Sequence, residues 1–157
     1  MEQQTKALIQ VVNQRIKDMN ALYREAARIS GISDGELSVW SILLHAQEPC
    51  SQYDLCEELS LPRQTVNSIV NGLIRKKFVV LEHVPGTRNR KSIHLTQEGL
   101  DFGREHVMWI FESEQRAMEA SDPQEVQLAI SMLERYTRCL RQEISGHGIE
   151  CDKTTAP

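Results

Sequence analysis

The stretch that decides the fold runs from Ser51 to Thr96 and reads SQYDLCEELSLPRQTVNSIVNGLIRKKFVVLEHVPGTRNRKSIHLT. It opens with a helix start, because Asp54 stands three residues after Ser51, the spacing at which the two side chains satisfy each other's backbone N–H groups. Pro62 is predicted to be the first residue of a second helix, since it lacks an N–H donor that the helix does not use at this position. The stretch is therefore predicted to begin with two short helices joined by a turn.

The second of these helices has two different faces. One face is apolar at helical spacing and carries Val66, Ile69, Val70 and Leu73. The other carries mostly short amides and hydroxyls, where a merely solvated face usually favours Lys and Glu; its members are Gln64, Asn67, Ser68, Asn71 and Arg75. Amides and hydroxyls can donate to and accept from the edges of DNA bases. The alternative, an ordinary solvated helix, does not explain the basic hairpin that follows.

That hairpin is predicted from a strand over 78–84, a turn over 85–90 and a returning strand over 92–95. Between Ser60 and Thr96 there are seven basic residues and one acid, Glu82, a net charge of +6 in a chain whose total is −4. Cations that neutralise phosphates supply most non-specific affinity for nucleic acids. The order helix, turn, helix and basic hairpin is that of a winged helix, and its charge predicts a nucleic-acid surface within an acidic chain.

Three further helix starts can be placed. Ser33 and Glu36 have the spacing of a capping box, and the helix that they open is expected to end near Glu48-Pro49. Thr96 can cap a long helix, and Asp122-Pro123 begins another, which is expected to end at 145–148, where two glycines occur.

Long amphipathic helices are predicted on both sides of the winged helix, over about 5–30 and 97–145. Neither has an obvious partner within the chain, whereas packing two chains together would bury both apolar stripes and place two recognition helices on one face. We expect one domain over residues 1–145, with its winged-helix region at about 33–96, and a disordered tail over 146–157.

Composition points away from other classes of protein. The first residues show no signal peptide, and no apolar run approaches the length of a membrane helix, so a soluble, cytoplasmic protein without membrane contact is expected. Four well-separated cysteines suggest thiols. The histidines and cysteines have no metal-site spacing, and no nucleotide loop or nucleophile motif occurs. Hence we expect no enzyme, no cofactor and no metal site.

Together these residues resemble the MarR family of winged-helix transcriptional regulators, over nearly the whole chain to about Ser145. The resemblance rests on 32–44, on 59–73 and, most specifically, on the basic wing that runs into Leu95-Thr96-Gln97-Glu98-Gly99. It implies a mainly α fold with a small β-hairpin wing and long terminal dimerisation helices. It also implies a homodimer that binds a palindromic operator in double-stranded DNA, with repression relieved by a ligand or an oxidant. Thr87 and Asn89 depart from the Asp and second Arg frequent in such wings.

Candidate DNA-contacting residues follow from the helix face and the wing. They are Arg63, Gln64, Thr65, Asn67, Ser68, Asn71, Arg75, Arg88, Arg90 and Lys91. Lys76 and Lys77 could equally be charges that favour a helix C-terminus through its dipole.

The sequence also offers a candidate effector pocket, a candidate redox-sensing cysteine and one rival function. The resemblance brings Tyr23, Trp40, Phe102, His106 and Trp109 together as a candidate pocket for a small aromatic or amphipathic effector, although ordinary core packing explains them equally well. Cys50 precedes a capped helix whose N-terminus could lower the pKa of its thiol, which would suit a redox-sensing regulator. The rival function is a winged helix whose wing binds an acidic protein.

Overall fold

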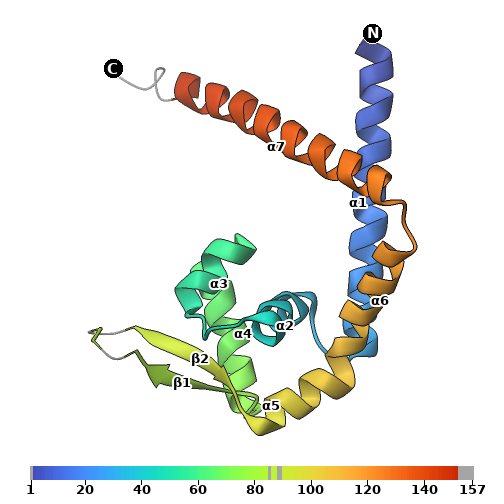
Figure 1. Cartoon of the computed structure of the whole chain (residues 1–157). Coiled ribbons are helices and arrows are strands. Elements are labelled where there is room, and N and C mark those ends of the chain that lie inside the picture. The colour runs from blue at the N-terminus through green and yellow to red at the C-terminus, as the bar shows by residue number, and fades with distance from the viewer. Residues whose placement is uncertain (1, 85, 88–89, 152–157) are drawn as a thin grey trace, which may run out of the picture. The chain divides into compact units, whose positions relative to one another are not determined.

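The computed structural model of the protein describes residues 2–84, 86–87 and 90–151 (Figure 1). In chain order the elements are α1 (Glu2–Ile29), α2 (Asp34–His45), α3 (Gln52–Leu59), α4 (Arg63–Arg75), β1 (Val79–His83), β2 (Lys91–Leu95), α5 (Gln97–Phe102), a π-helix η1 (Gly103–Val107), α6 (Met108–Glu119) and α7 (Pro123–Cys151). This is the predicted mainly helical winged helix. The contacts divide the chain into two compact units, Met1–Glu112 and Ser113–Pro157, and each is described by itself.

The predicted helix starts are confirmed by their hydrogen bonds. Glu36 N–H donates to Ser33 Oγ at 3.2 Å, and Ser33 N–H donates back to the Glu36 carboxylate at 3.0 Å. Ser51 and Asp54 form the same reciprocal pair. The backbone N–H groups of Gln124 and Glu125 donate to Asp122 Oδ1. Each helix start could be predicted from the sequence because the residues that form its cap lie within one turn of helix.

The wing is an antiparallel pair in which Val79 is opposite Leu95 and His83 is opposite Lys91. A third segment joins the other edge of β2, where Ser51 forms an isolated bridge with Ser92 and Ile93 N–H donates to Cys50 O at 2.8 Å. The residues just before α3 are therefore tied directly to the wing.

A single apolar core holds α2, α3, α4 and the wing together. Val66, Val70 and Leu73 of α4 are fully buried, as their spacing predicts, whereas Ile69 is only partly buried. Across from them lie fully buried side chains of other elements, among them Trp40, Leu55, Val79 and Ile93. This packing fixes which face of α4 points outward.

The Leu-Thr-x-x-Gly sequence acts as a junction between the wing and α5. Thr96 Oγ1 donates to Lys77 O at 2.6 Å and accepts the N–H of Gly99 at 3.0 Å, while Thr96 N–H donates to Phe78 O at 3.0 Å. These bonds draw the first turn of α5 against the end of α4. A Cβ on Gly99 would stand 2.0 Å from Phe78 O, so only glycine fits this approach.

The long helix predicted after Thr96 contains an interruption that the sequence did not indicate. Over Gly103–Val107 the backbone widens to a π-helix, and Met108 N–H donates to Gly103 O, five residues back. A Cβ on Gly103 would lie 2.7 Å from the Leu44 Cδ2 atom and 3.3 Å from the Trp40 ring. The wider turn therefore occurs where a helix backbone packs tightly on α2.

Two predicted helix ends are wrong. Helix α2 ends at His45, earlier than the predicted Glu48-Pro49, and the N–H of Ala46 closes its last turn on Ile42 O. Helix α7 continues to Cys151, although it was expected to end at 145–148 and to be followed by a disordered tail. Glycine lowers helix stability by about 1 kcal/mol but keeps its N–H, so two glycines do not by themselves end a helix. The remainder of the predicted tail, 152–157, lies outside the described residues.

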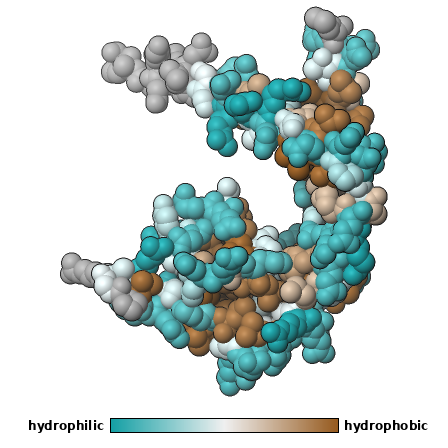
Figure 2. All heavy atoms as spheres, viewed as in Figure 1, coloured by the Kyte–Doolittle hydropathy of each residue, from teal (hydrophilic) through white to brown (hydrophobic). Residues whose placement is uncertain are grey.

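The long helices α1 and α7 each expose apolar side chains. On α1, Leu8, Val11, Met19 and Leu22 are more than half exposed, and Figure 2 shows brown, hydrophobic atoms along the N-terminal part of this helix. On α7 the exposed apolar residues are Leu128, Ile130, Met132, Leu133, Tyr136, Leu140 and Ile144. No helix among the described residues is both long enough and apolar enough to span a membrane.

Candidate nucleic-acid interface

The helix-turn-helix is formed by α3, a short connection and α4. Helix α3 ends at Leu59, and its C-cap Ser60 adopts a left-handed conformation with φ 51°. Leu61 N–H then donates to Cys56 O at 3.2 Å and closes the last turn. Pro62 follows as the N-cap of α4 and not, as predicted, as its first residue. This connection turns the chain so that α4 packs across α3 with its polar face outward.

The exposed face of α4 is the one that the sequence predicts. Gln64, Thr65, Ser68 and Asn71 are exposed, and Asn67 is partly exposed. All five are amides or hydroxyls, which can both donate and accept hydrogen bonds. Their contact with DNA bases stays a prediction, but the surface that it requires is present.

Among the described basic residues of the wing, Arg90 is held in place by an ion pair. Arg90 Nη2 donates to both carboxylate oxygens of Asp54, at 3.2 and 3.0 Å, and so links the wing to the first turn of α3. Thr87, at the position where an Asp is frequent in such wings, donates through Oγ1 to Val84 O at 2.8 Å. Arg88, a candidate contact, lies outside the described residues.

A second cation is also paired across the fold. Lys76 Nζ lies 2.5 Å from the Glu36 carboxylate and joins the end of α4 to the start of α2, so Lys76 is a tertiary ion pair as well as a helix C-terminal charge. Among the described residues of the +6 stretch, the other cations have no carboxylate within 4 Å and are exposed; they are Arg63, Arg75, Lys77 and Lys91. Of the cations that the structure describes in this stretch, these four are the ones without a carboxylate partner that would compete with a phosphate.

Both capping carboxylates are stabilised in their charged form. The pKa of Asp54 is lowered mainly by the backbone N–H and the hydroxyl of Ser51, with a smaller contribution from Arg90. Burial acts to raise the pKa of Glu36, but hydrogen bonds from Lys76 and from Ser33 outweigh it and leave the pKa lowered. Folding therefore favours the ionised form of both carboxylates.

These shifts predict the direction of acid destabilisation. A carboxyl whose pKa is lowered on folding stabilises the native state above its unfolded pKa, and this stability is lost as the pH falls through the folded pKa. The urea midpoint of the wild type should fall from neutral pH to about pH 3, and Glu36→Gln should flatten part of that decline. Glu57→Gln, on the exposed face of α3, is the control and should keep the wild-type pH dependence; equal curves for Glu36→Gln and the wild type would contradict the assignment.

The predicted effector residues are brought together only in part. The centroid of the Phe102 ring lies 5.6 Å from that of Trp40 and 4.7 Å from that of His106. Phe78, which was not among the predicted residues, stacks on Phe102 with 4.5 Å between the ring centroids. The Trp109 indole N–H donates to Ser30 Oγ at 3.1 Å and to the carbonyl of His106 at 3.0 Å.

Most of this cluster is packed core. Trp40 is fully buried, and its indole N–H has no hydrogen-bond partner among the described residues. Tyr23 lies on α1 with 38% of its surface exposed. A ligand could therefore reach Phe102, His106 and Trp109, which are partly or fully exposed, but not Trp40 without a rearrangement.

The predicted lowering of the Cys50 pKa is wrong, because the structure raises it. Burial raises the pKa of its thiol, and the nearby carboxylates of Asp54 and Glu58 raise it further. The lowered pKa was expected from the helix N-terminus alone, without the burial of the thiol and without the two acids that α3 itself carries. A raised pKa disfavours the reactive thiolate, so the physical reason for a redox sensor at Cys50 is removed.

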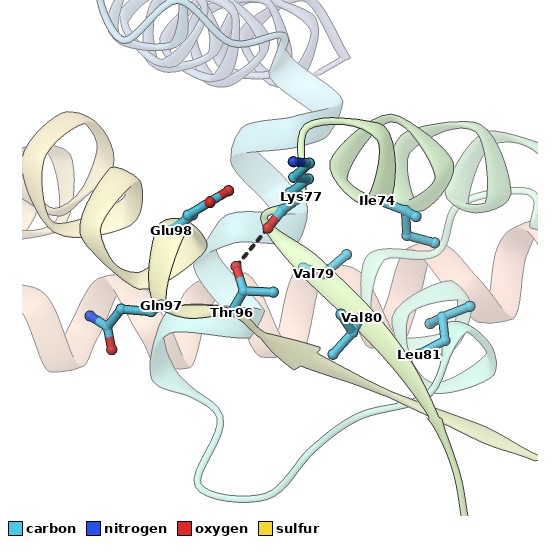
Figure 3. A pocket seen from close by; sticks show the side chains of 8 residues that line it. All are labelled: Ile74, Lys77, Val79, Val80, Leu81, Thr96, Gln97 and Glu98. Carbon is cyan, nitrogen blue, oxygen red and sulfur yellow. Dashed lines mark hydrogen bonds between the residues drawn. The ribbon is translucent and has the colours of Figure 1, made fainter.

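The described residues also contain a cavity of about 770 Å³ between the end of α4, β1 and the start of α5 (Figure 3). Ile74, Val79, Val80 and Leu81 form its apolar lining, and the Thr96–Lys77 hydrogen bond crosses its edge. The candidate effector residues do not line it. No group of three or more His, Cys, Asp or Glu in the described part of the chain could hold a metal ion.

The fold and this surface define a class: a winged helix with long flanking helices and a basic, amide-rich face. Comparison with known proteins agrees. A model of the MarR family matches residues 30–88, the part that contains α2, α3, α4 and β1. The comparison with curated proteins finds no match.

Solved structures of MarR proteins share the fold over most of the chain. A MarR family regulator from Neisseria meningitidis has a TM-score of 0.75 at 15% identity, covering 89% of this chain and 98% of that one. A MarR/EmrR family transcriptional regulator from an Acinetobacter species has 0.69 at 19%, covering 88% and 97%. MepR of Staphylococcus aureus, in a complex with DNA, has 0.66 at 19%, covering 83% and 95%. A MarR family model thus matches the winged-helix region of this chain, and solved MarR structures share its fold over most of the chain's length.

Proposed function

We propose that this chain is a transcriptional repressor that binds a palindromic operator in double-stranded DNA as a homodimer. The observation that carries the proposal is the outer face of α4, where exposed amides and hydroxyls share the helix with the unpaired cations Arg63 and Arg75. Two further unpaired cations, Lys77 and Lys91, follow on the chain segments that come next. Amides and hydroxyls suit base edges, and the cations suit phosphates. The solved complex of MepR with DNA, which has the same fold, supports this reading.

The exposed apolar residues of α1 and α7 support the homodimer. Contiguous apolar surface of this kind is rare on a monomer and typically marks an interface. A two-fold dimer would present two copies of α4, matched to half-sites about one helical turn of DNA apart. Sedimentation of the free protein should therefore give twice the chain mass.

Release by a small effector is the regulatory part of the proposal. The partly exposed rings of Phe102, His106 and Trp109 offer a surface for an aromatic or amphipathic ligand next to the core. An effector releases DNA only to the extent that it binds the dimer conformation with the wrong spacing of its reading heads more tightly.

The deciding experiment is fluorescence anisotropy with a labelled duplex from the gene's own upstream region, compared with a scrambled duplex. We expect two chains per site and tighter binding to the upstream duplex. Salt-sensitive binding without selectivity would place the operator elsewhere. No binding to either duplex at low salt would overturn the DNA proposal and favour the rival, a wing that binds an acidic protein.

A substitution tests the role of α4 in selectivity. Gln64→Ala should reduce discrimination between the two duplexes by about tenfold, because a good side-chain contact with a base edge contributes about 1–3 kcal/mol. Affinity for the scrambled duplex should change little. Gln47→Ala, an exposed glutamine after α2, is the matched control. Equal losses on both duplexes for Gln64→Ala would contradict a base-reading role.

A further inference from the structure

The Asp54 carboxylate links the start of α3 to the wing. It accepts hydrogen bonds from the backbone N–H and the hydroxyl of Ser51, each at 2.8 Å, which closes the first turn of α3. It also accepts from Arg90 Nη2, which belongs to the wing 36 residues later. Ser51 itself is buried and bridges to Ser92 of β2. The carboxylate therefore lies where the start of α3 meets the wing near the turn end of its hairpin.

The wing has few other attachments on this side. Val84 N–H donates to Arg90 O at 2.9 Å and closes the hairpin on itself, and the partners of Thr87 among the described residues are Val84 and Arg90. Of the described hydrogen bonds, those from Arg90 to Asp54 are the ones that connect this outer part of the hairpin to another element. Lys91, an exposed cation, comes next in the chain.

We propose that Asp54 is a positioning residue for DNA binding: through Arg90 it fixes the outer wing against α3 and so sets where the wing's cations stand relative to α4. The proposal rests on the proposed function. It assigns Arg90 an anchoring role in place of the free phosphate contact that the sequence suggested. It also explains how a wing with Thr87 at the usual Asp position keeps an ordered arginine.

The direction in which Asp54→Asn changes DNA affinity distinguishes a positioning role from a purely electrostatic effect of the carboxylate. Asp54→Asn removes a negative charge from the basic surface, so electrostatics alone would tighten DNA binding. If Asp54 positions the wing, the same change should weaken binding, by about fivefold to tenfold in a dimer that loses two such contacts. The matched control is Glu57→Gln, which removes one charge from the same helix at an exposed position; it should tighten binding slightly or leave it unchanged. Asp54→Glu keeps the charge and the capping geometry and should retain most of the affinity.

A double-mutant cycle excludes a mere loss of the helix cap. Asp54→Asn could weaken DNA binding by loosening α3, whether or not Arg90 is present. If positioning is the cause, Asp54→Asn should have little further effect in an Arg90→Gln background. An equal loss in both backgrounds would overturn the proposal.

A measurement without DNA keeps the proposal separate from the function on which it rests. Hydrogen exchange of the Val84 amide, which donates to Arg90 O, should accelerate in Asp54→Asn and in Arg90→Gln but not in Glu57→Gln. If the protein fails to bind DNA while this exchange pattern holds, the anchoring of the wing stands and the DNA proposal falls. If DNA binds but Asp54→Asn behaves like Glu57→Gln in both assays, the positioning role falls alone.

Discussion

Gly99→Ala should lower the free energy of unfolding by about 3 kcal/mol or more, because overpacking against rigid backbone commonly costs 1–3 kcal/mol and this contact is tighter than usual. A Cβ would stand 2.0 Å from Phe78 O and 2.9 Å from the carbon that carries it. The clash cannot be relieved by rotating a side chain, since both atoms are backbone. Relief requires moving α5 away from Phe78, which breaks the hydrogen bonds of Thr96 at the same junction.

Gly146→Ala is the matched control for this change. Gly146 lies within α7, and a Cβ there would meet nothing within 4 Å. Alanine should therefore leave stability unchanged or raise it by up to about 1 kcal/mol. Both variants are compared by urea unfolding at one protein concentration, because the stability of a dimer depends on concentration. A Gly99→Ala midpoint equal to that of the wild type would show that the junction adjusts freely.

Affinity for DNA should fall by about a thousandfold or more between 50 and 200 mM salt. This range is typical of six to ten neutralised phosphates, each of which releases counterions. The four described cations without a carboxylate partner occur twice in a dimer, which brings the expected number of contacts into that range. The measurement is anisotropy at several salt concentrations, with the slope of log affinity against log salt as the result.

Single substitutions show how much individual cations contribute to the salt dependence of DNA binding. Arg63→Gln should reduce its magnitude by about two, since each dimer loses two contacts and each contact contributes about 0.9. Arg28→Gln serves as the control, because Arg28 lies on α1 in an ion pair with Glu25. A slope near zero for the wild type would argue against phosphate contacts as the source of affinity.

The features that the sequence predicted well are local ones. The capping pairs of Ser33 with Glu36 and of Ser51 with Asp54, and the cap at Thr96, need only residues within one turn of helix. The buried and exposed faces of α4 follow from its helical period. A pattern of three or four residues is a physical constraint that operates wherever the segment lies in the fold.

The features that were missed depend on distant parts of the chain. Arg90 meets Asp54, and Lys76 meets Glu36 40 residues away, so no local spacing could indicate that two of the basic residues are already paired. The thiol of Cys50 was missed for two reasons. Its place before a helix suggested a lowered pKa, but burial, which only the fold produces, raises the pKa, and so do Asp54 and Glu58 on the helix that follows.

The π-helix η1 also determines which side chains of the following helix face the core. A residue added to or removed from an α-helix turns all later side chains by about 100° around the axis, because 3.6 residues complete one turn. The wider turn over Gly103–Val107 supplies such a rotation, and Ile110, only 4% exposed, then faces the core. A regular α-helix over the same residues would turn Ile110 away, so the widened turn brings the buried residue in the first turn of α6 to the core of the winged helix.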